Sequence, residues 1–254
     1  MIERKAYPIL EYDTERNAVI NPSHYSAEPL EADRLIITFF PEVLQKLLQE
    51  EVIRTARIIP GENPIVLYAF TDDPDVLITP GVIGCPACAG DLDQLYGMGI
   101  RKVMFCGGGG VLDTSIGVGR LLLVDGAIRD DGFSYHYVEP SRVIYADEAV
   151  NTVIAGYLDA HGIPYLRGLT WTTDALFRET REKVALRRSE GAKIVEMEQS
   201  GCLAVAQYRG LRYGALIYAG DDVSQDIWDK RDWRSRNGLR YDLVMLCREL
   251  VREI

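Results

Sequence analysis

Carboxylates stand at the ends of two predicted strands in this chain of 254 residues. The segment Val195-Glu-Met-Glu198 lies between an apolar strand and an apolar helix, and Gly220-Asp-Asp222 follows another apolar strand. In open α/β folds, ligands and catalytic groups gather beyond the carboxyl ends of strands. A carboxyl group that is buried there holds its proton more readily and can act as a general acid. A solvated acidic strand end is the alternative interpretation of the first segment.

Two glycine-bearing stretches also follow predicted strands. Gly107–Gly110 comes directly after Lys102–Cys106, and Gly81–Gly90 leads into a helix. Glycine lets backbone N–H groups approach a ligand closely, so the first stretch can bind an anion. It fits neither the dinucleotide-binding pattern nor a P-loop, because no acidic residue and no Gly-Lys-Ser/Thr follow at the required spacing. A tight crossover without a ligand is the alternative.

The cysteines and histidines do not form a recognisable metal site. Five cysteines, an odd number, argue against a disulfide framework and fit a reducing compartment. Cys85-Pro-Ala-Cys88 has the spacing of a redox motif, but no second such pair completes a zinc site. His24, His136 and His161 are not at metal-ligand spacing from one another. We therefore expect no metal and no cofactor.

Composition and charge exclude several classes of partner. The formal net charge is −10 with no dense Lys/Arg block, which argues against binding to nucleic acid. A small anionic substrate stays possible, since a few local arginines or N–H groups can bind it. No apolar run approaches the roughly 18–20 residues that span a bilayer, and the N-terminus is too charged for a signal peptide. We expect a cytoplasmic protein without a membrane partner.

Short apolar strands alternate with helical patterns along the chain. This alternation predicts βαβ units and a single α/β domain over residues 1–254, with a central mixed, largely parallel twisted sheet flanked by helices. The polar, turn-rich residues 1–33 are expected to form an N-terminal arm. Strands are predicted at 34–40, 65–70, 76–79 and 102–106 and near 120–128, 165–172, 193–197 and 212–219; helices are predicted from Pro41, from the 81–90 loop to Gly97 or Gly99, and near 146–161, 198–209 and 240–253.

The order of these motifs resembles the nucleoside phosphorylase and nucleosidase superfamily, which includes uridine phosphorylase, hexameric purine nucleoside phosphorylase and methylthioadenosine nucleosidase. The likeness runs from about Leu35 to Asp222. Phe105–Leu112 is similar to the family's glycine-rich strand end, Gly81–Pro86 to its Gly-x-Gly-Gly-Pro-type loop, Trp171–Phe177 to its base-stacking strand, Val195–Glu198 to its ribose-binding Glu-Met-Glu, and Gly220-Asp221 to its Ser-Asp.

The resemblance implies a role for each of these residues. Asp221 is the general acid that protonates a purine base. Glu196, Met197, Glu198 and His24 bind the ribose; Thr173, Leu176 and Phe177 bind the base; Gly84, Gly107, Gly108, Gly109 and Gly110 line the pocket for the anion or nucleophile. His24 would come from the arm of a neighbouring subunit, so we expect a homodimer or hexamer with shared active sites. A solvated arm histidine is the alternative for His24, and ordinary core packing is the alternative for Phe177.

The chain departs from the family where phosphorylases hold phosphate. The first loop reads Thr38-Phe-Phe-Pro-Glu42, and the Arg and Thr positions around the glycine run carry Phe105 and Gly108. In the nucleosidase branch a glutamate at the corresponding helix start activates water, and Glu42 can take that role. Arg54 or Arg57 can match an arginine donated by a neighbouring subunit.

The expected function is therefore cleavage of the N-glycosidic bond of a purine ribonucleoside, with ribosyl transfer to phosphate as co-substrate. One alternative is a nucleoside hydrolase that uses water with Glu42 as base. Another is a non-catalytic nucleoside-binding protein of the same fold. A third is an unrelated α/β enzyme, in which Asp113, Asp221 and Asp222 are generic strand-end carboxylates.

Overall fold

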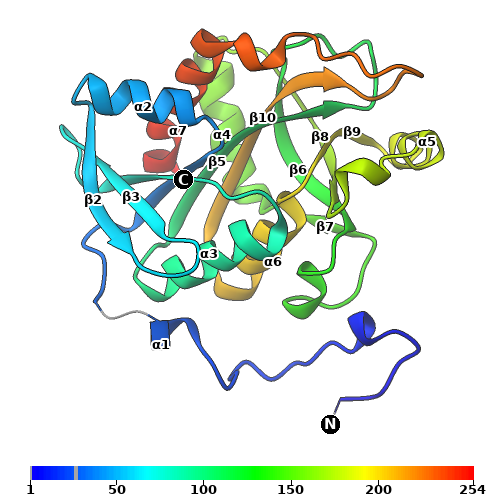
Figure 1. Ribbon diagram of the computed structural model, residues 1–254, viewed down its shortest axis with the longest axis horizontal. Helices are drawn as coiled ribbons and strands as arrows, with labels where there is room; N and C mark the ends of the chain where they lie inside the picture. The colour runs from blue at the N-terminus through cyan, green and yellow to red at the C-terminus, as the bar shows by residue number, and fades with distance from the viewer. Residues whose placement is uncertain (1, 26–27) are drawn as a thin grey trace.

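The computed structural model describes residues 2–25 and 28–254, and ten strands in this part of the chain join in one sheet (Figure 1). The strands are β1 (Arg34–Thr38), β2 (Ile53–Ile59), β3 (Ile65–Phe70), β4 (Val76–Pro80), β5 (Lys102–Val111), β6 (Leu121–Asp130), β7 (Val143–Tyr145), β8 (Tyr165–Thr173), β9 (Ala192–Glu196) and β10 (Arg212–Asp222). The helices are α1 (Pro22–Tyr25), α2 (Pro41–Gln49), α3 (Cys85–Gly97), α4 (Glu148–Ala160), α5 (Arg181–Ser189), α6 (Gln199–Arg209) and α7 (Asn237–Glu253).

Five strands of the sheet close into a ring. β5 pairs with β10 and β9, β10 pairs with β6, β6 pairs with β8, and β8 pairs with β9. β1 and β4 extend β5 in parallel, and β3 and β2 continue the sheet as antiparallel strands to an open edge. The predicted mixed α/β sheet is confirmed. The pairs β4–β1, β1–β5, β5–β10, β6–β8 and β8–β9 are parallel, whereas β2–β3, β3–β4, β5–β9, β6–β10 and β6–β7 are antiparallel.

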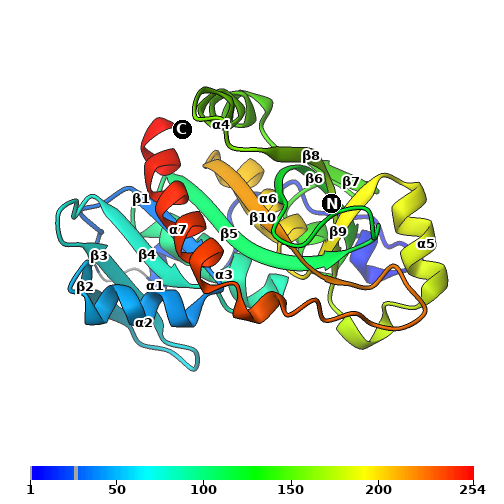
Figure 2. The same ribbon diagram turned by 90° about the horizontal axis from the view of Figure 1, so that it is seen from above.

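Helices cover both faces of the sheet, because strands such as β1 are apolar on both sides. α3 and α6 lie on one face and share a buried cluster with Leu35 and Phe105. α2, α4 and α7 lie on the other face and pack around Ile36 and Phe40. Figures 1 and 2 both show β2 and α5 at opposite ends of the molecule. Residues 2–25 run beside the α3 and α6 face in Figure 1.

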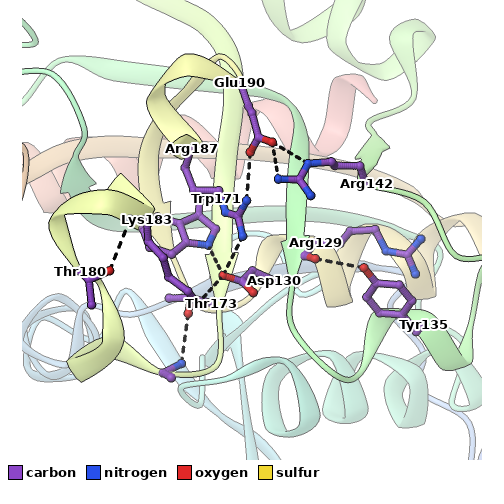
Figure 3. A network of polar contacts seen from close by, with 11 residues as sticks. Arg129, Asp130, Tyr135, Arg142, Trp171, Thr173, Thr180, Lys183, Arg187 and Glu190 are labelled. Atoms are coloured by element: carbon purple, nitrogen blue, oxygen red, sulfur yellow. Dashed lines mark hydrogen bonds and ion pairs between the residues drawn. The ribbon is translucent and has the colours of Figure 1, made fainter. Parts of the chain in front are cut away.

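Helix α5 is fixed to the ring by a half-buried carboxylate. Asp130, at the end of β6, accepts hydrogen bonds at one oxygen from Trp171 Nε1 (3.1 Å), Lys183 Nζ (3.0 Å) and Arg187 Nη2 (3.2 Å), as Figure 3 shows. Burial raises the pKa of Asp130, but these hydrogen bonds outweigh it and leave the pKa below its ordinary value. A glutamate in the next turn, Glu190, pairs with Arg187 as well. The ring and α5 therefore form one rigid unit.

The glycine run corrects the predicted loop after Cys106. Gly107–Gly110 continues β5, and its residues pair with β10 and β9. A side chain on Gly108 would lie 2.8 Å from the ring of Tyr218, and one on Gly109 would lie 2.5 Å from the carbonyl oxygen of Val195. The glycines are thus required for the close approach of the strands that close the ring.

Replacement of Gly109 by alanine should therefore destabilise the fold. The added methyl group meets a backbone carbonyl that cannot move without opening the β5–β9 pairing, so we expect a loss of about 1–3 kcal/mol in the free energy of unfolding. Gly156, exposed on α4 with no atom within 4 Å of an added Cβ, is the matched control. Gly156→Ala should stabilise by about 0.5–1 kcal/mol. Urea unfolding that gave equal stability for both variants would contradict the close approach.

Candidate active site

A gap between β1 and β9 opens along one edge of β5. The β1–β5 pairing ends at Cys106, and the β5–β9 pairing begins at Gly110. The stretch Gly107–Gly109 therefore lies between the carboxyl end of β1 and the carboxyl end of β9, neither of which pairs with it. Such a switch point is where α/β sheets bind ligands.

Glu198 reaches this region from the start of α6. One carboxylate oxygen accepts a hydrogen bond from Gly84 N at 2.8 Å, and the other accepts from Met197 N at 3.3 Å. Gly84 has φ = +97°, a conformation that favours glycine, so the Gly81–Gly90 loop can aim its N–H group at the carboxylate. Burial, and then the charge of Glu196, raise the pKa of Glu198 to about 8. The side chain is therefore poised to exchange a proton near neutral pH.

Glu196 holds the start of α6 instead of facing the gap. Its carboxylate accepts hydrogen bonds from the hydroxyl of Thr172 and from the backbone N–H groups of Glu198 (2.6 Å) and Gln199 (2.7 Å). These are N–H groups that a helix start leaves without a backbone partner. Burial raises the pKa of Glu196 to about 7. Of the two glutamates predicted to bind ribose, Glu196 is therefore engaged within the protein and positions Glu198.

Asp221 lies beside two residues that the sequence did not single out. Trp228 Nε1 donates a hydrogen bond to Asp221 Oδ2 at 2.6 Å. Glu179 is half-buried, and burial together with the charge of Asp221 raises its pKa to about 7. In the sequence, Glu179 belongs to the charged run Arg178–Glu182, which is typical of a solvated surface. The sequence pattern therefore did not indicate that Glu179 lies near Asp221. The structure thus provides a pair of carboxyl groups at this point.

The residues predicted to bind a base lie at the end of β8. Thr173 is buried and accepts a hydrogen bond from Ala175 N (3.2 Å). Leu176 and Phe177 follow on a short 3₁₀ helix and are 53% and 95% exposed. Core packing, the alternative for Phe177, is therefore wrong. The ring is free of the core of its own chain and available to a ligand or a second chain.

Aromatic rings occupy the positions where the family resemblance places phosphate ligands. Phe39 and Phe105 lie with ring centroids 5.2 Å apart, and the Phe39 ring covers Gly81 and approaches Gly107. Glu42, in the first turn of α2, forms an ion pair with Arg240 of α7 at 2.5 Å. The charge of Glu42 is thus compensated by an arginine nearly 200 positions later in the chain, which no local pattern predicts.

The residues expected from a neighbouring subunit lie on the surface. His24 is exposed on α1, which contacts α3, and its Nδ1 accepts a hydrogen bond from Asn21 N. Arg57 donates hydrogen bonds to the backbone oxygen and the carboxylate of Glu28, whereas Arg54 is exposed on β2. Arg54 is therefore the arginine that is better placed to reach another chain.

The structure gives no metal centre within the part of the chain that it describes, where no three candidate ligands come together. The thiols of Cys85 and Cys88 are buried, and burial contributes to raising the pKa of both. Cys85 Sγ lies 3.3 Å from the carbonyl oxygen of Met197, and Cys88 Sγ lies 3.8 Å from Cys202 Sγ. These cysteines pack α3 against α6 beneath Glu198. Among the described helices, none has the length and apolar character to cross a bilayer.

A family model described as the phosphorylase superfamily matches residues 33–241. The chain belongs to this superfamily. A guanosine phosphorylase of Halorubrum lacusprofundi is 27% identical over 180 residues, which are 68% of this chain and 75% of the relative. This phosphorylase family includes glycosyltransferases and N-glycosyl hydrolases, and the chain is an enzyme of that class.

Solved structures of superfamily members share the fold. A uridine phosphorylase from Vibrio fischeri superposes with a TM-score of 0.72 at 18% identity, covering 90% of this chain and 99% of the other. A futalosine hydrolase mutant from Helicobacter pylori gives a TM-score of 0.69 at 18% identity, with 89% and 99% covered. The same fold therefore carries both phosphorylases and a hydrolase.

The buried glutamates should make the stability of the protein fall with increasing pH. Their pKa values in the folded state, about 7 and about 8, lie above the ordinary value of 4.5, so the folded state binds more protons between these limits. The stabilisation is complete below pH 4.5 and is lost as the pH rises through 7 and 8. We expect urea midpoints to be higher at pH 5 than at pH 9, with a smaller difference in Glu198→Gln.

The exposed Glu62 provides the control for this measurement. Glu62→Gln should keep the pH dependence of the unmodified chain. An unchanged pH dependence in Glu198→Gln would show that this carboxyl group is not protonated by burial.

Proposed function

We propose that the chain cleaves the N-glycosidic bond of a purine ribonucleoside, with Glu198 as the group that binds the ribose. The observation that carries this proposal is the buried carboxylate of Glu198 beside the β5 gap, held by Gly84 N and Met197 N. Cleavage passes through a ribosyl cation in which positive charge develops at C1′. With a pKa of about 8, Glu198 is ionised in only a minor fraction of molecules at neutral pH, so we expect the rate to rise as the pH increases towards 8. In the ionised form, a preorganised carboxylate in a site with little water stabilises that charge strongly and accepts hydrogen bonds from the vicinal hydroxyls.

The carboxyl pair at Glu179 and Asp221 supports a purine as the leaving base. As the C1′–N bond breaks, its electron pair stays on the base, and a proton on N7 makes the purine a better leaving group. A carboxyl group with a pKa of about 7, the value to which Glu179 is raised, holds that proton for part of the time at neutral pH. Glu179 is the proposed source of the proton, and Asp221 is the neighbouring carboxylate whose charge helps to raise the pKa of Glu179. The guanosine phosphorylase relative is consistent with a purine.

Water is the acceptor that the geometry favours. The apolar rings of Phe39 and Phe105 offer no hydrogen bonds to a phosphate dianion, which binds best to paired N–H donors such as arginine. Glu42, which follows Phe39 in the chain and lies in the first turn of α2, is the proposed base that removes a proton as the water oxygen bonds to C1′. Its carboxylate forms an ion pair with Arg240, which fixes the side chain at the start of α2.

Phosphorolysis is the second candidate, and the phosphorylases among the relatives favour it. In that case Gly107–Gly109 would supply N–H groups, and Arg54 of a second subunit would supply a cation. We propose a homodimer or hexamer with shared sites for either reaction. The N-terminal arm supports association because Val19 and Ile20 are 97% and 62% exposed. The free, buried cysteines support the proposed cytoplasmic location.

Product analysis distinguishes the two acceptors. Guanosine, inosine, adenosine and uridine are incubated with the protein in phosphate-free buffer and with added phosphate, and base, ribose and ribose 1-phosphate are quantified. We expect release of a purine together with free ribose at a rate that phosphate does not change. Strict dependence on phosphate with ribose 1-phosphate as the only sugar would establish the second candidate, and binding without base release would contradict both.

Loss of the Glu198 carboxylate should raise the activation free energy of glycosidic cleavage while leaving the protein folded. Glu198→Gln keeps the size of the side chain and one acceptor oxygen, but it replaces the other oxygen by an NH2 donor and removes the negative charge of the ionised form. We expect kcat/KM to fall about 10²–10³-fold, or about 2.7–4 kcal/mol, for the nucleoside that is cleaved. Glu62→Gln should keep full activity. A rate within threefold of the unmodified enzyme in folded Glu198→Gln would remove Glu198 from the mechanism.

A further inference from the structure

A second cavity, of about 880 Å³, lies away from the candidate active site. It is formed by the loop after β5 and by the chain around the starts of β8 and β9. β9 connects the two places, since Lys193 lines the cavity and Glu198 follows the other end of the strand. At about 3.3 Å per residue, Lys193 and Glu196, which lie near the two ends of the strand, are roughly 10 Å apart. None of the residues assigned to nucleoside binding lines this cavity.

The cavity concentrates positive charge in a chain of net charge −10. Arg120, Arg188 and Lys193 line it, and its lining includes one carboxylate, that of Asp113. Arg188 pairs with that carboxylate at 2.7 Å. Arg120 and Lys193 form no ion pair with any residue that the structure describes. Two cations without counter-charges thus face the same space.

The walls of the cavity are held in place without a ligand. Arg231 donates hydrogen bonds to the carbonyl oxygens of Ile116 (2.8 Å) and Thr114 (3.2 Å), and Gly119 N donates to the carbonyl oxygen of Ala219 (2.8 Å). Arg188 is carried by α5, which the Asp130 contacts fix to the ring. A largely preformed cavity of about 300–1,000 Å³ is typical of a small-molecule site.

The lining of the cavity also includes apolar side chains. Ile116, Val118, Pro164 and Leu166 line it, so one ligand can meet both a charged and an apolar surface. Arginine binds phosphate in a bidentate manner, and lysine adds a point charge. A free inorganic anion would use the cations only, whereas a nucleotide would also bury its base.

We propose that this cavity is a binding site for a small phosphorylated metabolite of nucleotide size, separate from the nucleoside site. Arg120 and Lys193 bind the phosphate, Arg188 contributes when it turns from Asp113, and the apolar side chains contact the organic part. This site does not depend on the proposed function, because none of the proposed catalytic residues contributes to it.

Calorimetric titration of GMP, AMP and inorganic phosphate into the full chain tests the proposal. We expect at least one mononucleotide to bind more tightly than inorganic phosphate, with an affinity that falls as salt is raised. The double variant Arg120→Gln/Lys193→Gln should weaken that binding at least tenfold. Lys46→Gln, on exposed α2 surface, is the matched control and should bind as the unmodified chain does.

Glu198→Ala separates the two sites in the same titration. Mononucleotide binding that persists in Glu198→Ala and is lost in the double variant supports the proposal. Binding that is lost in Glu198→Ala but kept in the double variant would place the ligand in the nucleoside site and overturn it. The absence of mononucleotide binding at millimolar concentration would also overturn the proposal. A change of oligomeric state in the double variant would overturn it too, because the cavity would then belong to an interface between copies of the chain.

Discussion

The buried carboxylate of Glu196 is the contact on which the candidate site depends. It joins the end of β9 to the start of α6 by accepting from the N–H groups of Glu198 and Gln199 and from Thr172 of the neighbouring strand. Burying an ionisable group is costly unless its hydrogen bonds are satisfied, and here three donors satisfy them. With α6 fixed in this way, the next carboxylate along the chain, Glu198, is directed to the gap.

The gap depends on the close approach of the β5 backbone to β9 and β10, which the glycines of β5 allow because they carry no side chain. The glycines of β5 let β10 pair along one edge of this strand and β9 pair with the end of the other edge, beyond the point where β1 diverges. Gly84 then brings a single N–H group to Glu198 from a loop more than 100 positions away in sequence. The candidate site therefore depends on glycines in β5 and at position 84, where a larger residue would disturb the backbone. It also depends on the carboxyl group of Glu198, whose pKa burial raises to about 8.

Features that neighbouring residues encode could be predicted from the sequence, whereas contacts between distant elements could not. The apolar strands, the order of motifs and the Glu-Met-Glu segment are local patterns, and they predicted the sheet and the class of enzyme correctly. β2 was missed because most of its residues are exposed at the open edge, and α5 was missed because it is highly charged. The Arg240 partner of Glu42 and the proximity of Glu179 to Asp221 depend on distant elements meeting in space, which no spacing in the sequence encodes.

The central claim is that Glu198 recognises the ribose hydroxyls as the glycosidic bond breaks. Comparison of kcat/KM for guanosine and 2′-deoxyguanosine, in the unmodified enzyme and in Glu198→Gln, tests it as a double-mutant cycle. If the carboxylate binds the 2′-hydroxyl, the unmodified enzyme prefers guanosine at least tenfold and the variant loses most of that preference. An equal preference in both enzymes would contradict the account, because the hydroxyl and the carboxylate would then act independently.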